Sequence, residues 1–423
     1  MKQALSRARG ATLRYGLSLL EQGMGAALNF LFNLWLIRAA GASSYGVYVL
    51  WAAIALVMTS VVNAFTGTHL VPLPPGREHW QSRREIESVL LSVTIWLLFA
   101  TGVITFGGLV GARALFHNRA PWSGAIFLPA VMLYQYGRML AFSRGEVRYA
   151  AAMTAAVLAL SLSALEILQL GHIGFQPEAL LVIQALSYGI PGLVLVYGMS
   201  PGVRIDLRPG SLLHFRRYLG GSRWIMLGTC CYEIMTRFYS FLVAGMLGAT
   251  ALSQLSAAQV PLRPGSLVVN AWVPVVRAEL VRHRRNHDWK RFRDRLVIGT
   301  ISTALVTAAL TVLVWWAWPL IAGRMYRGRY SDASMVVVFW GIDLVIAGAA
   351  LALAVGLQAT ANFRSIALAE LTGVALVVTL LPVVLMVTHD ANYAVLAMSI
   401  GPLAQILMML RALRGTRAAV LAQ

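Results

Sequence analysis

Charged residues are scarce in this sequence. Asp, Glu, Lys and Arg make up 12% of its 423 residues, whereas about 25% is usual for soluble domains. Lysine is nearly missing and occurs only as Lys2 and Lys290. Because 58% of the residues are hydrophobic and the mean hydropathy is +0.70, the composition excludes an ordinary soluble domain and indicates a membrane protein.

Common motifs of catalysis are also missing. The sequence contains no GxxxxGK[ST] loop, HExxH, GxSxG or CxxC, and the first absence excludes ATP hydrolysis by the P-loop route. Its two cysteines, Cys230 and Cys231, are adjacent, a spacing at which disulfides rarely form. We therefore expect a protein that is not an enzyme, with no catalytic residues, metal site or cofactor.

Long apolar runs predict about twelve transmembrane helices. A helix needs about 20 residues to cross a hydrocarbon core of about 30 Å, and it satisfies its own backbone there. The predicted spans are 13–37, 47–71, 88–111, 122–142, 149–170, 179–199, 223–246, 252–275, 296–320, 333–357, 366–388 and 393–411. The predicted fold class is an all-α polytopic membrane protein.

Basic residues are distributed unevenly over the connections. If the N-terminus is cytoplasmic, and basic residues near span ends are counted with the adjoining connection, 27 of the 35 lie in cytoplasmic segments and 6 in external loops, while Arg237 and Arg263 lie inside spans. This is the positive-inside bias of membrane proteins. It predicts cytoplasmic N- and C-termini, and it accounts for the net charge of +19 without a nucleic-acid partner.

The two halves resemble each other at an offset of 207 residues. Segment 36–43 aligns with 243–250, and polar residues of the first span recur in the seventh. The pairs are Gln22 with Thr229, Asn29 with Thr236, and Asn33 with Ser240. Two six-helix lobes of equal orientation are the parallel-repeat plan of several transporters. We predict an N-terminal lobe at 1–200, a cytoplasmic interfacial linker at 201–222 and a C-terminal lobe at 223–423, around a central cavity.

Charged residues inside spans predict where a site lies, because such charges usually face water or each other. Glu233 and Arg237 are four residues apart and share a helix face. Either they form an intrahelical ion pair, or Arg237 binds an anionic substrate while Glu233 orients it, since a guanidinium recognises phosphate through two hydrogen bonds. Arg263 lies in a segment with Pro261 and Pro264, which predicts a broken helix that forms either a site or a packing kink.

Two sets of candidate residues follow. The candidate substrate-binding residues are Arg237, Arg263, Gln22, Asn29, Asn33 and Asn270. The candidate ion-coupling residues are Glu21, Asp343 and Glu233. For Glu21, pairing with Arg14 or with a neighbouring helix is the favoured alternative.

Two short stretches resemble a known family. Residues 36–48, LIRAAGASSYGVY, are similar to the first junction between spans in Wzx-type polysaccharide repeat-unit flippases of the multidrug/oligosaccharidyl-lipid/polysaccharide exporter superfamily. Residues 319–321 and 328–333 resemble the junction before the tenth span. Span count, length, basic charge and the two-half plan also match.

The resemblance implies a flippase of the bacterial inner membrane for exopolysaccharide, capsule or O-antigen synthesis. It would work by alternating access and move a polyprenyl-diphosphate-linked oligosaccharide to the periplasmic leaflet. The implied partners are this substrate, membrane lipids, a polysaccharide polymerase and a chain-length regulator. A cation-coupled multidrug exporter of the same superfamily is the main alternative. A membrane glycosyltransferase or polymerase is less favoured, because the external loops are short.

Overall fold

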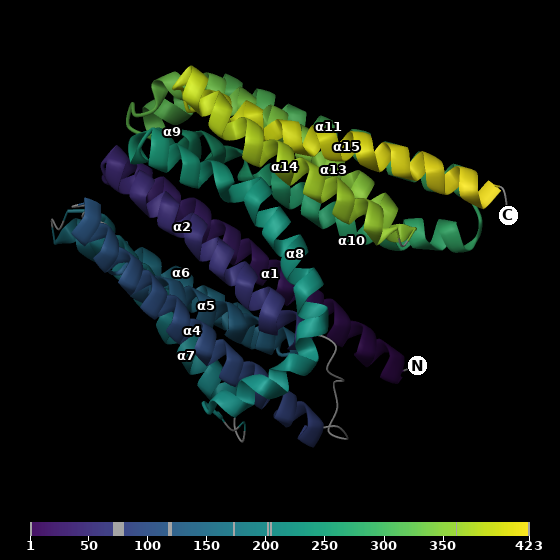
Figure 1. Ribbon diagram of the computed structural model, residues 1–423, viewed down its shortest axis with the longest axis horizontal. Helices are drawn as coiled ribbons and strands as arrows, with labels where there is room; N and C mark the ends of the chain where they lie inside the picture. The colour runs from purple at the N-terminus through teal and green to yellow at the C-terminus, as the bar shows by residue number, and fades with distance from the viewer. Residues whose placement is uncertain are drawn as a thin grey trace. The chain divides into compact units, whose positions relative to one another are not determined.

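The computed structural model is built of helices (Figure 1). It describes residues 2–70, 80–116, 121–171, 174–200, 203, 205–360 and 362–421. Nine helices in these ranges are long and apolar enough to cross a membrane, which confirms the prediction of an all-α, multi-pass membrane protein. The chain folds as two compact units, Met1–Thr229 and Cys230–Gln423. The limits at 200 and 222 and the cavity between the lobes stay predictions.

The first unit is organised around α5. Its elements are α1 (Lys2–Ala39), α2 (Ala42–Val62), the π-helix η1 (Asn63–Gly67), α3 (Thr68–Leu70), α4 (Trp80–Phe116), α5 (Gly124–Ser143), α6 (Val147–Leu170) and α7 (Pro177–Met199). Helix α5 packs against α7, α4 and α2. Its residues Met132, Tyr136 and Leu140 are buried together with Leu90 of α4 and Val196 of α7.

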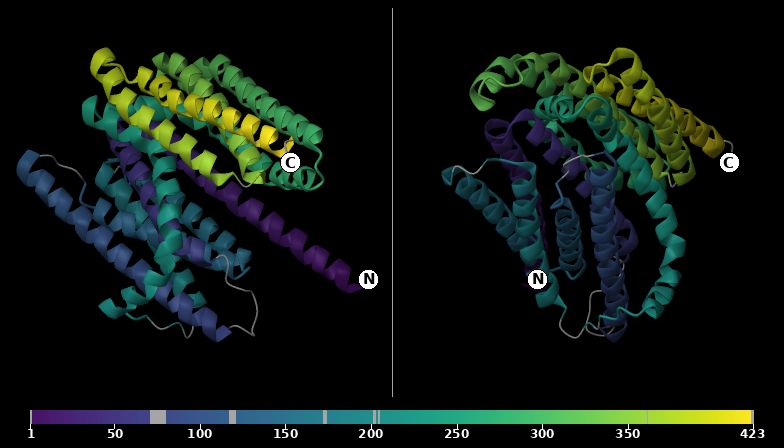
Figure 2. Two further views of the ribbon diagram at one scale, coloured as in Figure 1. Left: turned by 45° about the vertical axis from the view of Figure 1, so that its right-hand side comes forward. Right: turned by 60° about the vertical axis from the view of Figure 1, so that its left-hand side comes forward.

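The second unit is organised around α13. Helix α8 (Pro209–Met246) enters it from the first unit. It is followed by α9 (Ala249–Gln259), the 3₁₀ turn η3 (Val260–Leu262), α10 (Arg263–Arg285), α11 (Trp289–Trp316), α12 (Trp318–Leu320), the π-helix η4 (Ile321–Met325), η5 (Ser331–Ala333), α13 (Ser334–Ala359), α14 (Phe363–Thr388) and α15 (Asn392–Leu421). Figure 2 shows α11, α13, α14 and α15 as a bundle of long helices.

The internal repeat is confirmed by the helix limits. Helices α1 and α8 begin 207 residues apart and end 207 residues apart, and so do the starts of α2 and α9. Gly41 and Gly248 occupy the same N-cap position. The neighbours also correspond, because α13 packs against α15, α11 and the broken helix α9–α10 as α5 packs against α7, α4 and α2.

The broken helix predicted around Arg263 is present. Helix α9 ends at Gln259, and the 3₁₀ turn Val260–Leu262 separates it from α10, which begins at Arg263. Pro261 and Pro264 each lack a backbone N–H, so the regular α-helical hydrogen bonds cannot continue through this segment. The break places Arg263 at the first turn of α10.

Two glycines let the helices of the second unit approach closely. A Cβ atom added at Gly341 of α13 would lie 1.9 Å from Cγ2 of Thr311 on α11. One added at Gly299 of α11 would lie 2.1 Å from the ring of Trp272 on α10. Because real Cβ atoms do not approach so closely, this packing of the helices requires glycine.

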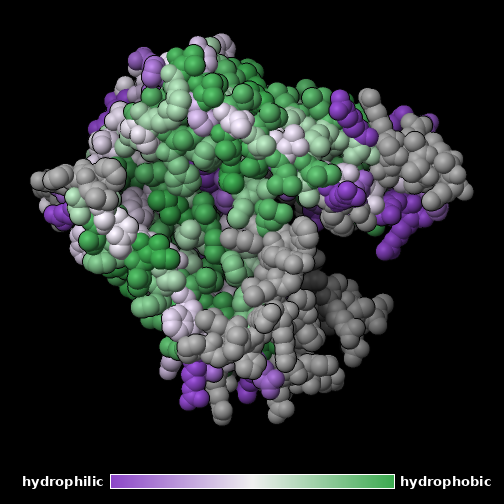
Figure 3. All heavy atoms as spheres, in the orientation of Figure 1, coloured by the Kyte–Doolittle hydropathy of each residue, from purple (hydrophilic) through white to green (hydrophobic). Residues whose placement is uncertain are grey.

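Hydrophobic side chains cover much of the helical surface. Figure 3 shows mostly hydrophobic residues along the helices and hydrophilic residues toward their ends. Exposed examples in the second unit are Val383 and Met386 of α14 and Leu407 of α15, which are 54%, 61% and 62% exposed. This distribution is that expected of helix walls in contact with lipid.

Candidate functional site

Arg237 projects from α8 one helical turn after Glu233. The distance from its Nε to Oε2 of Glu233 is 3.6 Å, which is within ion-pair range but longer than a hydrogen bond. The side chain of Glu233 is 8% exposed and that of Arg237 is 28% exposed. Among the described residues, the buried Nε of Arg237 finds no hydrogen-bond acceptor. The predicted ion pair is therefore present, and Nε is the guanidinium atom that faces Glu233 in it.

Charged residues from three helices lie near Tyr239, two residues further along α8. Arg237 of α8, Arg263 of α10 and Asp343 of α13 all lie close enough to interact electrostatically with its hydroxyl group. The Tyr239 ring packs edge-on against Trp340 of α13, with centroids 5.2 Å apart. The fold thus brings together three sequence-predicted candidates that are separated by up to about a hundred residues.

Asp343 is held between two helices of the second unit. Its Oδ1 accepts a hydrogen bond of 3.1 Å from the hydroxyl of Ser399 on α15. The Ser399 side chain is itself buried. This carboxylate has a neutral hydroxyl donor and lies within the membrane-spanning range 331–359. The ion-coupling role of Asp343 stays a prediction.

Glu21 is paired with Arg138, an arginine that the count of basic residues groups with a loop. Arg138 of α5 donates from Nε to Oε1 of Glu21 at 2.6 Å and from Nη2 to Oε2 at 2.9 Å. Thr154 of α6 donates to the same Oε1 at 3.1 Å, and its hydroxyl is 2.8 Å from that of Tyr134. The favoured alternative for Glu21, a partner on a neighbouring helix, is what the structure contains.

Arg138 lies inside the predicted span 122–142, near its end. The count of basic residues groups it with the connection that follows, whereas α5, which ends at Ser143, includes it. Helix ends are poorly defined by composition alone. The available sequence signal was the spacing of four residues between Arg138 and Phe142, which places both on one helix face. In the structure the guanidinium of Arg138 lies over the Phe142 ring, 5.3 Å from its centroid.

The amides of the first span have different surroundings. Asn33 is buried, donates to Oδ1 and to the carbonyl of Asn29 at 2.7 Å, and accepts from the hydroxyl of Tyr45 on α2 at 2.9 Å. It therefore ties the end of α1 to the start of α2. Gln22 and Asn29 are exposed. Asn270 lies in α10, and its side chain is outside the described part of the chain.

A second buried ionic group was not found from the sequence. Glu87 of α4 is 2% exposed and accepts from Arg83 at 2.9 Å and from Arg144 of the α5–α6 turn. Arg83 also donates to the hydroxyl of Ser143 at 3.2 Å, and Arg144 donates to the carbonyl of Met199 at the end of α7. The group joins the ends of α4, α5 and α7, so we interpret it as structural.

A tyrosine outside the membrane-spanning segments fixes the connection between α12 and α13. Tyr326 is buried, and its hydroxyl donates to the carbonyl of Ala257 at 3.0 Å. Burial raises the pKa of this hydroxyl, so it remains a neutral donor. The Tyr330 hydroxyl donates to Oγ of Ser253 at 3.2 Å, and the connection is thereby held against α9.

Comparison with known proteins shows the fold. No family model and no curated protein matches this sequence. The chain is similar to an inward-facing multidrug resistance transporter of the MATE family in the MOP superfamily, with a TM-score of 0.71 and 10% identity over 95% of this chain and 98% of that one. It is also similar to the lipid II flippase MurJ in an inward closed conformation, with a TM-score of 0.69 and 12% identity over 94% and 87% of the two chains.

A third solved structure extends this similarity. A MOP superfamily transporter from Pyrococcus furiosus, described as having a binding pocket of reversed polarity, gives a TM-score of 0.61 at 11% identity over 96% of this chain and 95% of that one. The similarities span nearly the whole chain, although the identities are low. The chain therefore has the fold shared by these MOP superfamily transporters.

Proposed function

We propose that this protein is a flippase that moves a polyprenyl-diphosphate-linked oligosaccharide repeat unit across the inner membrane, from the cytoplasmic to the periplasmic leaflet. The observation that carries the proposal is the Arg237 guanidinium, whose Nε makes a long ion-pair contact of 3.6 Å with Glu233 and no hydrogen bond, and which lies near Tyr239 together with Arg263. A buried polar atom without a hydrogen bond is rare in folded proteins. A diphosphate oxygen is the acceptor that a guanidinium binds most strongly.

The physical need for such a protein is clear. A diphosphate and its sugars cannot cross about 30 Å of hydrocarbon unaided, because each charge loses its hydration there. Arginine is suited to this task since it stays protonated and keeps its fixed donor geometry in a low dielectric. A fold similar to that of a protein described as a lipid II flippase supports the proposal.

A cation-coupled multidrug exporter is the second candidate. It is favoured by Asp343, an acid of α13 that has the neutral Ser399 hydroxyl as a donor, and by the similarity to a MATE transporter. In that case the carboxylates would be essential and Arg237 would not. Substrates would then be cations, and surface polysaccharide would not depend on the protein.

The deciding experiment compares variants in a strain from which the gene has been deleted. For a flippase, we expect a complete lipid-linked repeat unit to accumulate on the cytoplasmic side, with surface polysaccharide restored by the wild-type protein. Arg237→Ala should restore it about tenfold less well or worse, because a charge-assisted hydrogen bond is worth about 1.5–3 kcal/mol. Arg148→Ala is the control, since Arg148 is 65% exposed. Membrane levels of each variant are measured by immunoblot.

The opposite result has an equally definite meaning. If lipid intermediates and surface polysaccharide are unchanged while sensitivity to cationic drugs rises, the flippase proposal is wrong. The exporter then takes its place if Asp343→Asn removes drug resistance and Arg237→Ala does not.

A further inference from the structure

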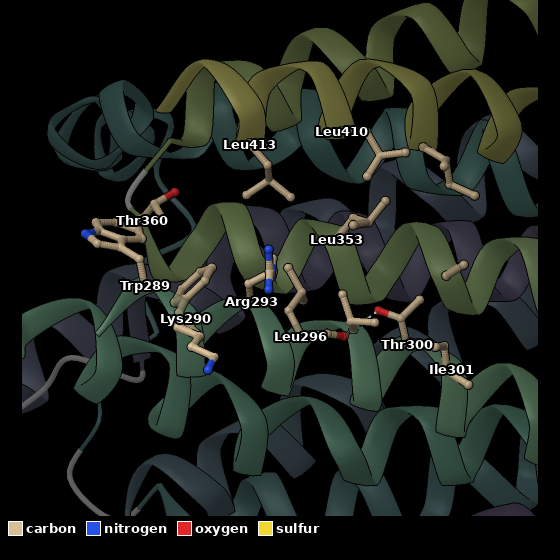
Figure 4. A pocket seen from close by; sticks show the side chains of 14 residues that line it. Trp289, Lys290, Arg293, Leu296, Thr300, Ile301, Leu353, Thr360, Leu410 and Leu413 are labelled. Carbon is tan, nitrogen blue, oxygen red and sulfur yellow. Dashed lines mark hydrogen bonds between the residues drawn. The ribbon is translucent and has the colours of Figure 1, made fainter. Parts of the chain in front are cut away.

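A pocket of about 810 Å³ lies within the second unit, between α11, α13 and α15 (Figure 4). Its inner wall includes the buried side chains of Leu296 and Leu353. Its outer rim includes Val297, Ile301 and Leu410, which are 47%, 52% and 37% exposed. The pocket is therefore apolar inside and opens on a hydrophobic helix surface.

The two ends of the pocket differ in chemistry. Figure 4 shows Trp289, Lys290 and Arg293 at one end and Thr300 and Ile301 at the other. The first end is the start of α11, and both of its basic residues lie in the first five positions of that helix. Arg293 has an exposed ion pair with Asp294 at 3.4 Å, and such pairs bind weakly. This end keeps a positive charge and has a tryptophan, the residue typical of a membrane interface.

The length of the pocket matches one leaflet of a bilayer. From Trp289 to Ile301 the helix rises about 18 Å at 1.5 Å per residue. Half of a hydrocarbon core of about 30 Å is about 15 Å. An acyl chain anchored at the level of Trp289 would thus extend along the pocket to Ile301, inside the predicted span 296–320.

We propose that this pocket binds an anionic phospholipid, with one acyl chain between α11, α13 and α15 and the phosphate on Lys290 and Arg293. Long basic side chains extend toward the interface while their stems stay on apolar surface, and basic residues there attract anionic headgroups. The site uses no residue of the proposed transport site, so the inference does not depend on the proposed function.

The test measures binding of two lipids to the purified, delipidated full-length protein. Dioleoyl phosphatidylglycerol and dioleoyl phosphatidylcholine share their acyl chains and differ in charge. Each is titrated while the thermal unfolding midpoint is followed, since a ligand that binds the folded state raises it. We expect phosphatidylglycerol to raise the midpoint at lower concentration than phosphatidylcholine.

Two pairs of variants separate the charged end from the apolar interior. Basic residues near a membrane surface each change affinity about fivefold, so Lys290→Ala with Arg293→Ala should weaken phosphatidylglycerol binding about 25-fold. The control, Arg291→Ala with Arg295→Ala, removes the same charge from the same helix at positions that do not line the pocket.

The apolar interior is tested by filling it. Val297→Trp should block the pocket and weaken binding of both lipids, whereas Ile298→Trp places the same ring on a neighbouring exposed position outside it. Equal affinities for the two lipids would overturn the proposal. So would an equal loss of phosphatidylglycerol affinity in the Lys290/Arg293 double variant and in its Arg291/Arg295 control. So would tighter binding of decaprenyl phosphate than of phosphatidylglycerol, because the pocket would then hold the tail of a polyprenyl lipid.

Discussion

Removing Arg138 should destabilise the first unit strongly, because it leaves a buried carboxylate without its main partner. Glu21 is 2% exposed and accepts two hydrogen bonds from Arg138, at 2.6 and 2.9 Å, and one from Thr154 at 3.1 Å. Breaking a buried ion pair by deleting one partner costs about 3–5 kcal/mol. Since Arg138 is 27% exposed, solvent screens part of the interaction, and we expect about 2–3 kcal/mol for Arg138→Ala.

The stability of detergent-purified variants, followed by tryptophan fluorescence during unfolding, measures this loss. Arg148→Ala on α6 is the control. Its ion pair with Glu146 is exposed, with side-chain exposures of 65% and 40%, so its loss should be below about 0.5 kcal/mol. Combining Arg138→Ala with Glu21→Gln should recover about half of the lost stability, because the second change removes the unpaired charge.

Two results would refute this reasoning. One is a loss of stability in Arg138→Ala that is no greater than the loss in Arg148→Ala. The other is a double variant that is no more stable than Arg138→Ala alone. The same variants also separate a structural from a coupling role for Glu21. If Glu21→Gln keeps its stability and its sensitivity to an ion gradient, the predicted coupling role for Glu21 is wrong.

Two further predictions concern close helix packing at Gly341 and the hydrogen bond between Tyr45 and Asn33. Gly341→Ala should destabilise the second unit by about 1–3 kcal/mol, because its Cβ would lie 1.9 Å from Cγ2 of Thr311. A Cβ added at Gly348 on the same helix would lie at an ordinary 3.7 Å from its nearest neighbour, so Gly348→Ala should stabilise the unit by up to about 1 kcal/mol. If both substitutions change the free energy of unfolding in the same direction, this account is wrong. Tyr45→Phe should cost about 1 kcal/mol by removing the hydrogen bond to Asn33, and an unchanged unfolding midpoint would show that this bond does not hold the corner between α1 and α2.

The choice between the two candidate functions rests on residues that lie in one unit. Arg237, Arg263 and Asp343 all lie near Tyr239, so each proposed activity can be tested by variants within one cluster. An anion-binding role predicts loss of activity when Arg237 is substituted. A cation-coupled role predicts loss of activity when Asp343 is substituted. The outcome depends on charge at defined positions rather than on the fold, which the transporters compared above share across different substrates.

Local sequence was enough to predict the helical class and the repeat. Long apolar runs must satisfy their backbone within one segment in lipid, so composition alone predicts helices. The offset of 207 residues reappears in the limits of α1 and α8 and in the N-caps Gly41 and Gly248. The two prolines around Arg263 predict the break between α9 and α10, since the missing N–H groups are a local property.

Only the tertiary structure decided which polar groups are partners. Arg138 is 117 residues from Glu21, and Ser399 is 56 residues from Asp343. A helix pattern gives the face on which a side chain lies, but not the helix that packs against that face. For the same reason, the cluster of Arg237, Arg263 and Asp343 and the pocket between α11, α13 and α15 could not be read from the sequence. Both depend on distances that arise when separate helices pack together.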